Sequence, residues 1–268
     1  MQTLLQFSFS KRLDETSRVC YSNCLAALMN ACLSKTPSEG PSVPQAIVDA
    51  GGLEVCISDL SLSDADRIAM DGTILSRKAG LLSRIIGIEA VTTKLMEVCH
   101  YRMVCRRVSL VKKGSAVEKW QVDEHAYFIR ILASLSNPSE KLRKVGLEEK
   151  VIESLLGIFP LPRMELGEVT PASVTLVPVS PAPTLLLGNA ARCLMAYADD
   201  ATVMKRLYEK DDLLGVQKLI CAMASCGDIR VRRNIAILLA KGCRIPAVRE
   251  KVSKFRGMQM MVELQDKL

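Results

Sequence analysis

A chain of 268 residues is long enough to bury a substantial core, in one domain or two. Apolar residues make up 49% of the sequence and aromatic residues only 4%, which favours helices packed through aliphatic side chains over a β-sandwich. The net charge is +7, and the whole excess lies in residues 201–268, which hold 14 Lys and Arg against 7 Asp and Glu.

The first predicted elements lie in residues 23–60. Leu25 and Leu28 begin an apolar stripe at helical spacing, which predicts an amphipathic helix. Pro44 suits the first turn of a second helix. The glycine pair that starts at Gly51 predicts a tight turn, because glycine adopts positive φ at little cost, and a third helix follows.

Copies of this pattern recur along the chain. Leu82 and Ile85 take the places of Leu28 and Ala31 in a second copy, which we expect to be compressed or to lack its intermediate helix. A third copy has its glycine turn at Gly146. The predicted repeats are residues 1–62, 63–101, 124–159, 185–227 and 228–268. A first helix over residues 4–18 is expected to cap the array, because each unit buries its apolar face only against its neighbours.

Two segments interrupt the repeats. Residues 102–123 are basic and contain the only tryptophan, Trp120. We expect an irregular, extended connector between repeats there, with helical structure in parts of it as an open alternative. Residues 160–184 hold six of the eleven prolines, interleaved with Val, Thr and Ser. Proline lacks a backbone donor and blocks a helix, so this segment is predicted to be a long loop or an extended linker.

The run ALMNAC followed by QAIVDAGGLEVCISDL closely resembles the second and third helices of an armadillo repeat. This resemblance implies an all-α, armadillo-like α-solenoid, a right-handed superhelix of about five imperfect repeats that forms a single domain over residues 1–268. A 45-residue separation between Asn189 and Asn234 is the length expected of one such repeat. The resemblance further implies a non-catalytic scaffold or adaptor that binds other proteins.

Armadillo proteins of the nuclear-import and catenin type clamp an extended peptide with an asparagine on each inner helix and a tryptophan four residues earlier. Only Asn30 matches the asparagine; the equivalent positions are Arg84, Ser134, Ala196 and Lys241. The tryptophan positions hold Ala26, Gly80, Arg130, Arg192 and Ile237. A single matching asparagine is not enough to clamp an extended peptide in this way. A receptor for nuclear-localisation signals is therefore not predicted.

Basic residues occupy several of these asparagine and tryptophan positions. A concave surface lined with positive charge attracts acidic partners and accelerates their encounter, so an acidic or helical segment of a protein is the predicted partner. The predicted binding residues are Asn30, Arg84, Arg130, Arg192, Arg233 and Lys241. The alternative is that these are solvated side chains with no common ligand, and that Asn30 is a satisfied polar group.

Two other functions stay open. The basic C-terminal face could contact nucleic acid phosphates, although the scarcity of aromatic side chains for base stacking argues against it. The chain is also similar to the C-terminal armadillo-like region of cytosolic assembly factors and co-chaperones that contain tetratricopeptide repeats. No tetratricopeptide pattern is present in the sequence.

Enzyme motifs are absent, and no catalysis, cofactor or metal is predicted. The sequence has no P-loop, GxSxG, HExxH or GxGxxG pattern. His100 and His125 lie in or beside separate repeats, and we expect His100 not to face Cys99, because adjacent residues on a helix diverge. No Cys-x-x-Cys pair occurs among the ten cysteines, which argues against structural zinc.

The cysteines also indicate a compartment. We expect buried thiols that act as small hydrophobes, and therefore a reducing environment, the cytoplasm or the nucleus. These predicted buried thiols are Cys20, Cys24, Cys32, Cys56, Cys193, Cys221 and Cys243. The N-terminus has no basic region before its short apolar run, so no signal peptide is predicted. No apolar run reaches the about 18 residues of a membrane span, so no membrane insertion is predicted.

Overall fold

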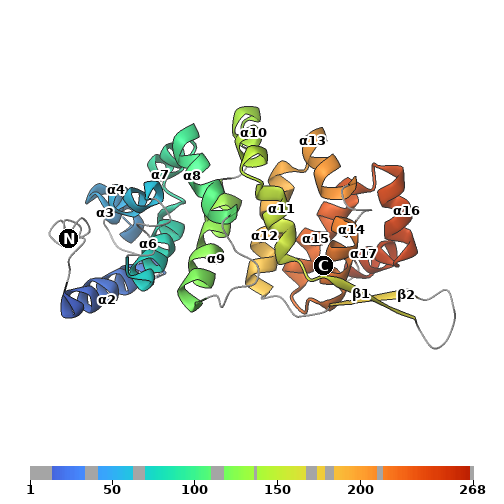
Figure 1. Cartoon of the computed structure of the whole chain (residues 1–268), viewed down its shortest axis with the longest axis horizontal. Coiled ribbons are helices and arrows are strands. Elements are labelled where there is room, and N and C mark those ends of the chain that lie inside the picture. Colours follow the sequence, from blue (N-terminus) through green and yellow to red (C-terminus); the bar gives the residue numbers. More distant parts are fainter. Residues whose placement is uncertain are drawn as a thin grey trace. The chain divides into compact units, whose positions relative to one another are not determined.

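The computed structural model describes residues 14–33, 42–62, 70–109, 118–135, 138–166, 174–178, 184–209 and 214–265. The chain forms two compact units, Met1–Leu135 and Ser136–Leu268 (Figure 1). Within the described residues it is helical apart from one two-stranded hairpin, so the all-α prediction is confirmed with this one addition. The boundary between the units falls inside the third predicted repeat, and the predicted repeat bounds stay a prediction.

The first unit contains two triplets of helices and a further long helix. Its elements are α2 (Glu15–Ala31), α3 (Val43–Asp49), α4 (Gly52–Ser58), η2 (Asp59–Ser61), α6 (Gly72–Ile85), α7 (Glu89–Leu95), α8 (Val98–Ser109) and α9 (Lys119–Ser134). The long helices α2, α6 and α9 pack in this order, α6 lying between the other two. The apolar faces of the shorter helices close the unit on the other side, where Ile47, Val91 and Tyr101 are fully buried.

Polar side chains fix where the long helices begin. The carboxylate of Asp14 accepts a hydrogen bond of 2.7 Å from the backbone N–H of Ser17 at the start of α2. Asp71 does the same for Thr73 at the start of α6, at 2.8 Å. Each carboxylate satisfies a backbone donor that has no partner within the helix, and its charge suits the positive end of the helix dipole.

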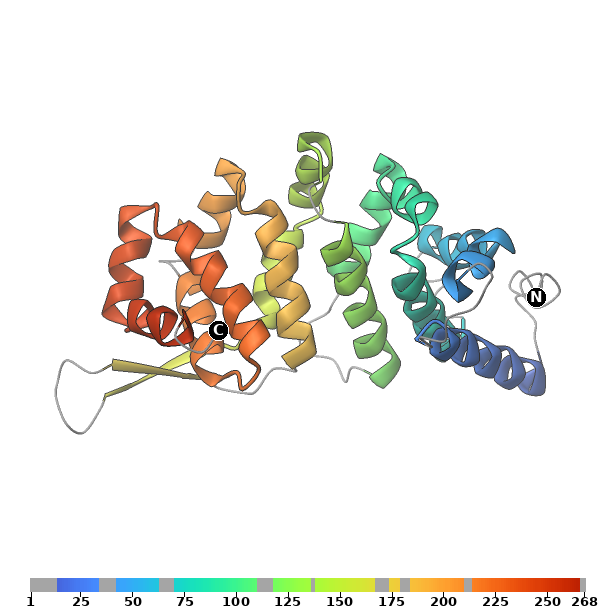
Figure 2. The same cartoon turned by 180° about the vertical axis from the view of Figure 1, so that it is seen from behind.

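The second unit repeats the order of one long and two shorter helical segments. Its elements are α10 (Glu140–Glu148), α11 (Val151–Ile158), β1 (Pro162–Leu166), β2 (Val174–Pro178), α12 (Thr184–Tyr197), α13 (Ala201–Met204), η3 (Lys205–Glu209), α14 (Leu214–Ser225), α15 (Ile229–Gly242), α16 (Pro246–Lys254) and α17 (Gly257–Gln265). The long helices α12 and α15 pack against each other, and α14 lies against α15 (Figure 2).

The turn that precedes α4 is the predicted glycine turn. Gly51 has a φ of 83°, in the left-handed region that glycine adopts without a steric penalty. The prediction of an equivalent turn at Gly146 is wrong, since Gly146 lies within α10. The left-handed residue is instead Lys150, with a φ of 58°, directly before α11. Arg256 holds the same position before α17.

The predicted compression of the second copy is wrong, because α7 supplies the intermediate helix. The predicted connector at 102–123 is also largely helical where it is described: residues 102–109 belong to α8 and residues 119–123 to α9. Tyr101, Val104 and Val108 form a buried stripe on α8 at helical spacing. The basic residues that suggested a connector occupy the other positions of this amphipathic helix.

The proline-rich segment contains a hairpin rather than only a loop. Strands β1 and β2 pair antiparallel, with Pro162 opposite Pro178 at the open end. A proline at the end of a strand leaves the inner ladder hydrogen bonds intact, and the Val and Thr residues of β2 favour extended backbone. β2 packs along α14. The loop prediction is wrong for the two strands, because the preference of β-branched residues for extended backbone outweighs the prolines there. Residues 167–173 and 179–183 lie outside the described residues.

Two smaller predictions also change. The predicted capping helix over residues 4–18 lies mostly outside the described residues, and its last part, from Glu15, is the start of α2. Cys20 is exposed, which contradicts its predicted burial, whereas Cys56, Cys193 and Cys221 are buried as predicted. Burial raises the pKa of the Cys56 thiol to about 12, so this group stays protonated as a small hydrophobe.

Candidate functional site

The five long helices carry all of the residues predicted to bind a partner. In the first unit, Asn30 is exposed near the end of α2, Arg84 is half-buried in the last turn of α6, and Arg130 is half-buried on α9. In the second unit, Arg192 is exposed on α12, while α15 carries an exposed Arg233 and a half-buried Lys241. A common binding surface for residues of both units stays a prediction.

The first unit brings Arg84 to the end of α2. Burial raises the pKa of the Cys32 thiol, and the positive charge of Arg84 opposes that rise. Cys32 directly follows α2 and lies two residues beyond Asn30, so the helix ends that carry Asn30 and Arg84 are close together. This agrees with the packing of α2 against α6.

A pocket that was not predicted opens between the same long helices. It has a volume of about 480 Å³ and contains side chains of α2, α6 and α9, including Asn30 and Trp120. Charged groups of both signs line it as well: Arg77, Glu118, Lys119 and Asp123. Aromatic surface beside exposed charge is typical of places where a partner side chain binds.

Trp120 therefore lies in the first turn of α9 and not in an irregular connector. A side chain at Gly72 would collide with its indole ring, whose Cε2 atom is 2.2 Å from the ideal Cβ position. The indole N–H donates a hydrogen bond to the Glu118 carboxylate. Glu118 and Gln121 form a capping box, so the EKWQ sequence held a signal for the helix start that could have located Trp120.

The second unit places a charged and apolar stripe on α15. Arg233, Ile237 and Lys241 are spaced four residues apart and so lie along one face of the helix. Ile237 is 40% exposed, so an apolar side chain lies between the two cations of this stripe. The neighbouring helix α12 contributes the exposed Arg192.

An acidic residue occupies part of this stripe. The Lys241 ammonium bonds to both carboxylate oxygens of Asp199, at 2.9 and 3.0 Å. Asp199 lies in the turn that follows α12, two residues beyond the end of this helix at Tyr197. The contact joins the turn after α12 to the stripe on α15, and it neutralises one of the predicted binding cations.

The two histidines have different environments. Contrary to the prediction, the Cys99 Sγ and His100 Nδ1 atoms lie only 3.5 Å apart, in the first turn of α8. His125 is buried on α9, and its Nε2 atom is 3.0 Å from the Val108 carbonyl oxygen. In the neutral imidazole, the Nε2–H group donates this hydrogen bond.

The His125 environment predicts a loss of stability in acid. Burial lowers the pKa of His125 below its usual 6.5, and the bond to Val108 opposes this shift only in part. The unfolded chain therefore binds a proton below about pH 6.5 that the folded chain does not, and stability falls as the pH drops through that value. We expect His125→Gln, which keeps a donor without titrating, to flatten this slope in urea unfolding at pH 7.5 and 5.5. An equal slope in both proteins would contradict the assignment.

No family model matches the sequence, and no curated protein matches it. Three solved structures have a similar fold over 98% of this chain. Two are engineered proteins, with TM-scores of 0.58 and 0.56, identities of 17% and 15%, and 87% and 97% of their own chains covered. The third is a designed armadillo repeat protein in complex with peptide (KR)4, with a TM-score of 0.53, 12% identity and 98% of its own chain covered.

These similarities establish the fold. The chain is an all-α, armadillo-like α-solenoid, as the helical stripes and the glycine turn at Gly51 predicted. In repeat folds of this kind each unit packs only against its neighbours, so stacked helices leave one extended helical surface exposed. Among the residues that the structure describes, no helix combines the length and the apolar character that a membrane crossing requires.

Proposed function

We propose that this chain is a non-catalytic protein-interaction scaffold that binds an acidic segment of a partner protein on the long helices α12 and α15. The observation that carries the proposal is the stripe of Arg233, Ile237 and Lys241 along one face of α15. An amphipathic segment with carboxylates on either side of an apolar residue would complement it: the carboxylates would meet the cations and the apolar side chain would cover Ile237.

Asp199 would act as an internal competitor in this mechanism. Its side chain is 72% exposed, so its carboxylate stays largely hydrated while it contacts Lys241. An exposed ion pair of this kind contributes less than about 1 kcal/mol, so a partner carboxylate can replace it at little cost. Removing Asp199 should then strengthen binding, by up to about fivefold.

The comparison with the designed armadillo repeat protein supports peptide binding in general terms. That protein is in complex with a basic peptide, (KR)4. The long helices of our second unit carry basic side chains, so we propose a peptide of the opposite charge. The free thiols of all ten cysteines fit a reducing compartment, and we place the scaffold in the cytoplasm or the nucleus.

A labelled helical peptide with a Glu-x-x-x-Leu-x-x-x-Glu pattern tests the proposal, because its spacing matches the stripe on α15. We expect Arg192→Glu/Arg233→Glu to weaken binding by on the order of tenfold or more, through lost attraction and added repulsion, and Asp199→Asn to strengthen it. Fluorescence anisotropy at two salt concentrations measures both effects.

The matched control is Lys141→Glu/Lys144→Glu, which reverses the same amount of charge at two exposed positions of α10 in the same unit. Equal weakening by both double variants would mean that net charge alone attracts the peptide, and the proposed surface would be wrong. Tight binding of a single-stranded oligonucleotide with a steep salt dependence, and none of the peptide, would favour the nucleic-acid alternative. The resemblance to co-chaperone regions would gain support from a chaperone or its client as the natural partner.

A further inference from the structure

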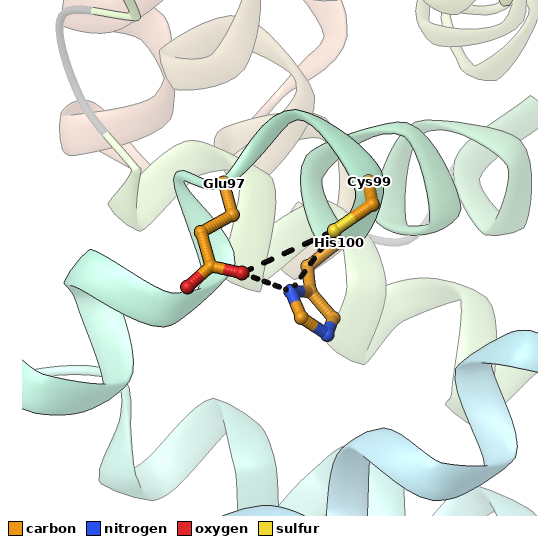
Figure 3. Close-up of side chains that lie close together, drawn as sticks. All are labelled: Glu97, Cys99 and His100. Atoms are coloured by element: carbon orange, nitrogen blue, oxygen red, sulfur yellow. Dashed lines mark hydrogen bonds and ion pairs between the residues drawn. The ribbon is translucent and has the colours of Figure 1, made fainter.

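Three side chains with metal-binding atoms gather where α7 gives way to α8. Glu97 lies directly before α8, and Cys99 and His100 lie in its first turn. The Glu97 Oε2 atom is 3.2 Å from His100 Nδ1 and 4.0 Å from Cys99 Sγ, and the latter two atoms are 3.5 Å apart. Figure 3 shows all three side chains turned toward one another, with their donor atoms at the corners of a small triangle.

We propose that Glu97, Cys99 and His100 form a binding site for a borderline divalent transition metal, best fitted by Zn²⁺. The site would supply three protein ligands and leave the remaining position to water. The inference is independent of the proposed binding surface on α12 and α15. It reverses the prediction of no metal, which relied on the absence of a Cys-x-x-Cys pair.

The spacing of the donor atoms fits one small ion. Zinc bonds of about 2.3 Å to sulfur and about 2.0–2.2 Å to nitrogen and oxygen place tetrahedral ligand atoms roughly 3.4–3.6 Å from one another. The distance from His100 to Cys99 already falls in this range at 3.5 Å, and that from His100 to Glu97 is slightly short at 3.2 Å. Only the distance of 4.0 Å between Glu97 and Cys99 must shorten, by about 0.4 Å.

The chemistry of the donors selects the metal. A thiolate, an imidazole nitrogen and a carboxylate oxygen together suit Zn²⁺ and Co²⁺, whereas Mg²⁺ and Ca²⁺ require oxygen ligands throughout. Binding deprotonates the thiol: the Cys99 S–H bond breaks, a sulfur–metal bond forms, and one proton passes to solvent. Three protein ligands with an open position is also the arrangement of zinc sites that hold a water molecule.

Lys94 is a charged group outside the triad that contacts it. The Lys94 ammonium lies 3.0 Å from Glu97 Oε1 and 3.1 Å from Oε2, and its side chain is 42% exposed. It can keep its bond to Oε1 and orient the carboxylate while Oε2 binds the metal, as outer-shell partners of metal ligands do. Its positive charge would also repel the ion. These two effects oppose each other.

Titration of the full chain with Co²⁺ tests the site, since a thiolate bound to Co²⁺ gives a charge-transfer band in the near ultraviolet. We expect one equivalent to bind, Zn²⁺ to displace it, and Cys99→Ser to abolish the band. His100→Ala and Glu97→Gln should each weaken binding by at least about 10–100-fold, the loss that removing even an outer-shell partner of a metal ligand causes. Lys94→Ala should change it by no more than about fivefold in either direction, because the ion pair is exposed.

Cys20→Ser is the matched control, because Cys20 is also an exposed thiol but lies on α2. It should leave the Co²⁺ titration unchanged, and Zn²⁺ should protect Cys99 and not Cys20 from alkylation by iodoacetamide. A band that survives unchanged in His100→Ala and Glu97→Gln would show simple thiol binding and overturn the site. So would the absence of a stoichiometric band in the unsubstituted chain.

Discussion

Replacing Lys78 by methionine is expected to destabilise the first unit by about 3–5 kcal/mol, the typical cost of removing one member of a buried ion pair. Lys78 lies on α6 and is only 2% exposed. Its ammonium is 2.8 Å from a carboxylate oxygen of Asp59, which is itself buried in η2. Methionine keeps most of the packing of the stem, so the measured loss reports mainly on the charge.

The surroundings of this ion pair explain the size of the effect. The Lys78 ammonium also lies 5.9 Å from the centre of the Tyr21 ring, so one side chain of α6 contacts both α2 and η2. The nearby Cys56 thiol has its pKa raised to about 12, mainly by burial, which marks the region as poorly hydrated. Without Lys78, the Asp59 carboxylate would lose a cation in a region with little access to water.

Lys94→Met is the matched control for this prediction. It breaks an ion pair of similar length, 3.0 Å to Glu97, but one in which both side chains are more than 40% exposed. Such a pair contributes about 0.2–1 kcal/mol. Urea unfolding followed by circular dichroism measures both variants, and a difference between them below about 1 kcal/mol would contradict the account. Adding Asp59→Asn to Lys78→Met should recover part of the loss.

Local signals made the fold predictable. The apolar stripes of α2, α12 and α15 recur with the helical period within a single stretch of sequence, and Gly51 marks its own turn. The left-handed turn at Lys150 could not be predicted, because a lysine carries no preference for positive φ and tertiary packing imposes it. α8 was not predicted for a different reason: its basic residues suggested a connector, and the apolar stripe between them was overlooked.

The candidate sites depend on contacts between residues far apart in the sequence. Such contacts leave no local signal in the sequence. The pocket forms because Asn30 of α2 and Trp120 of α9 line the same cavity together with residues of α6. Lys241 forms an ion pair with Asp199, which is 42 residues away in the sequence, and this pair changes the charge of the predicted surface. By contrast, Glu97, Cys99 and His100 lie within four consecutive residues, so their cluster has a local sequence signal. A search for mixed ligand types, and not only for cysteine pairs, would have predicted it.

Gly215→Ala is expected to destabilise the second unit by roughly 2–3 kcal/mol, because the added methyl group has no room. An ideal Cβ at Gly215 would lie 2.2 Å from the backbone carbonyl oxygen of Leu207. Since that atom belongs to the backbone of η3, a rotamer change cannot relieve the collision, and η3 must move away from α14. The better helix propensity of alanine, about 1 kcal/mol, offsets only part of this cost.

Equivalent glycines provide a graded test of the same steric argument. Gly52 and Gly257 also lie at the start of the helix that ends a triplet, and an ideal Cβ would lie 2.7 Å from the Ile47 carbonyl oxygen and 3.1 Å from that of Val252, respectively. Destabilisation by alanine should therefore decrease from Gly215 to Gly52 to Gly257. Gly227→Ala is the control, because nothing lies within 4 Å of its Cβ position. If all four variants unfold at the same urea concentration, the close approach of these helices is not what requires glycine.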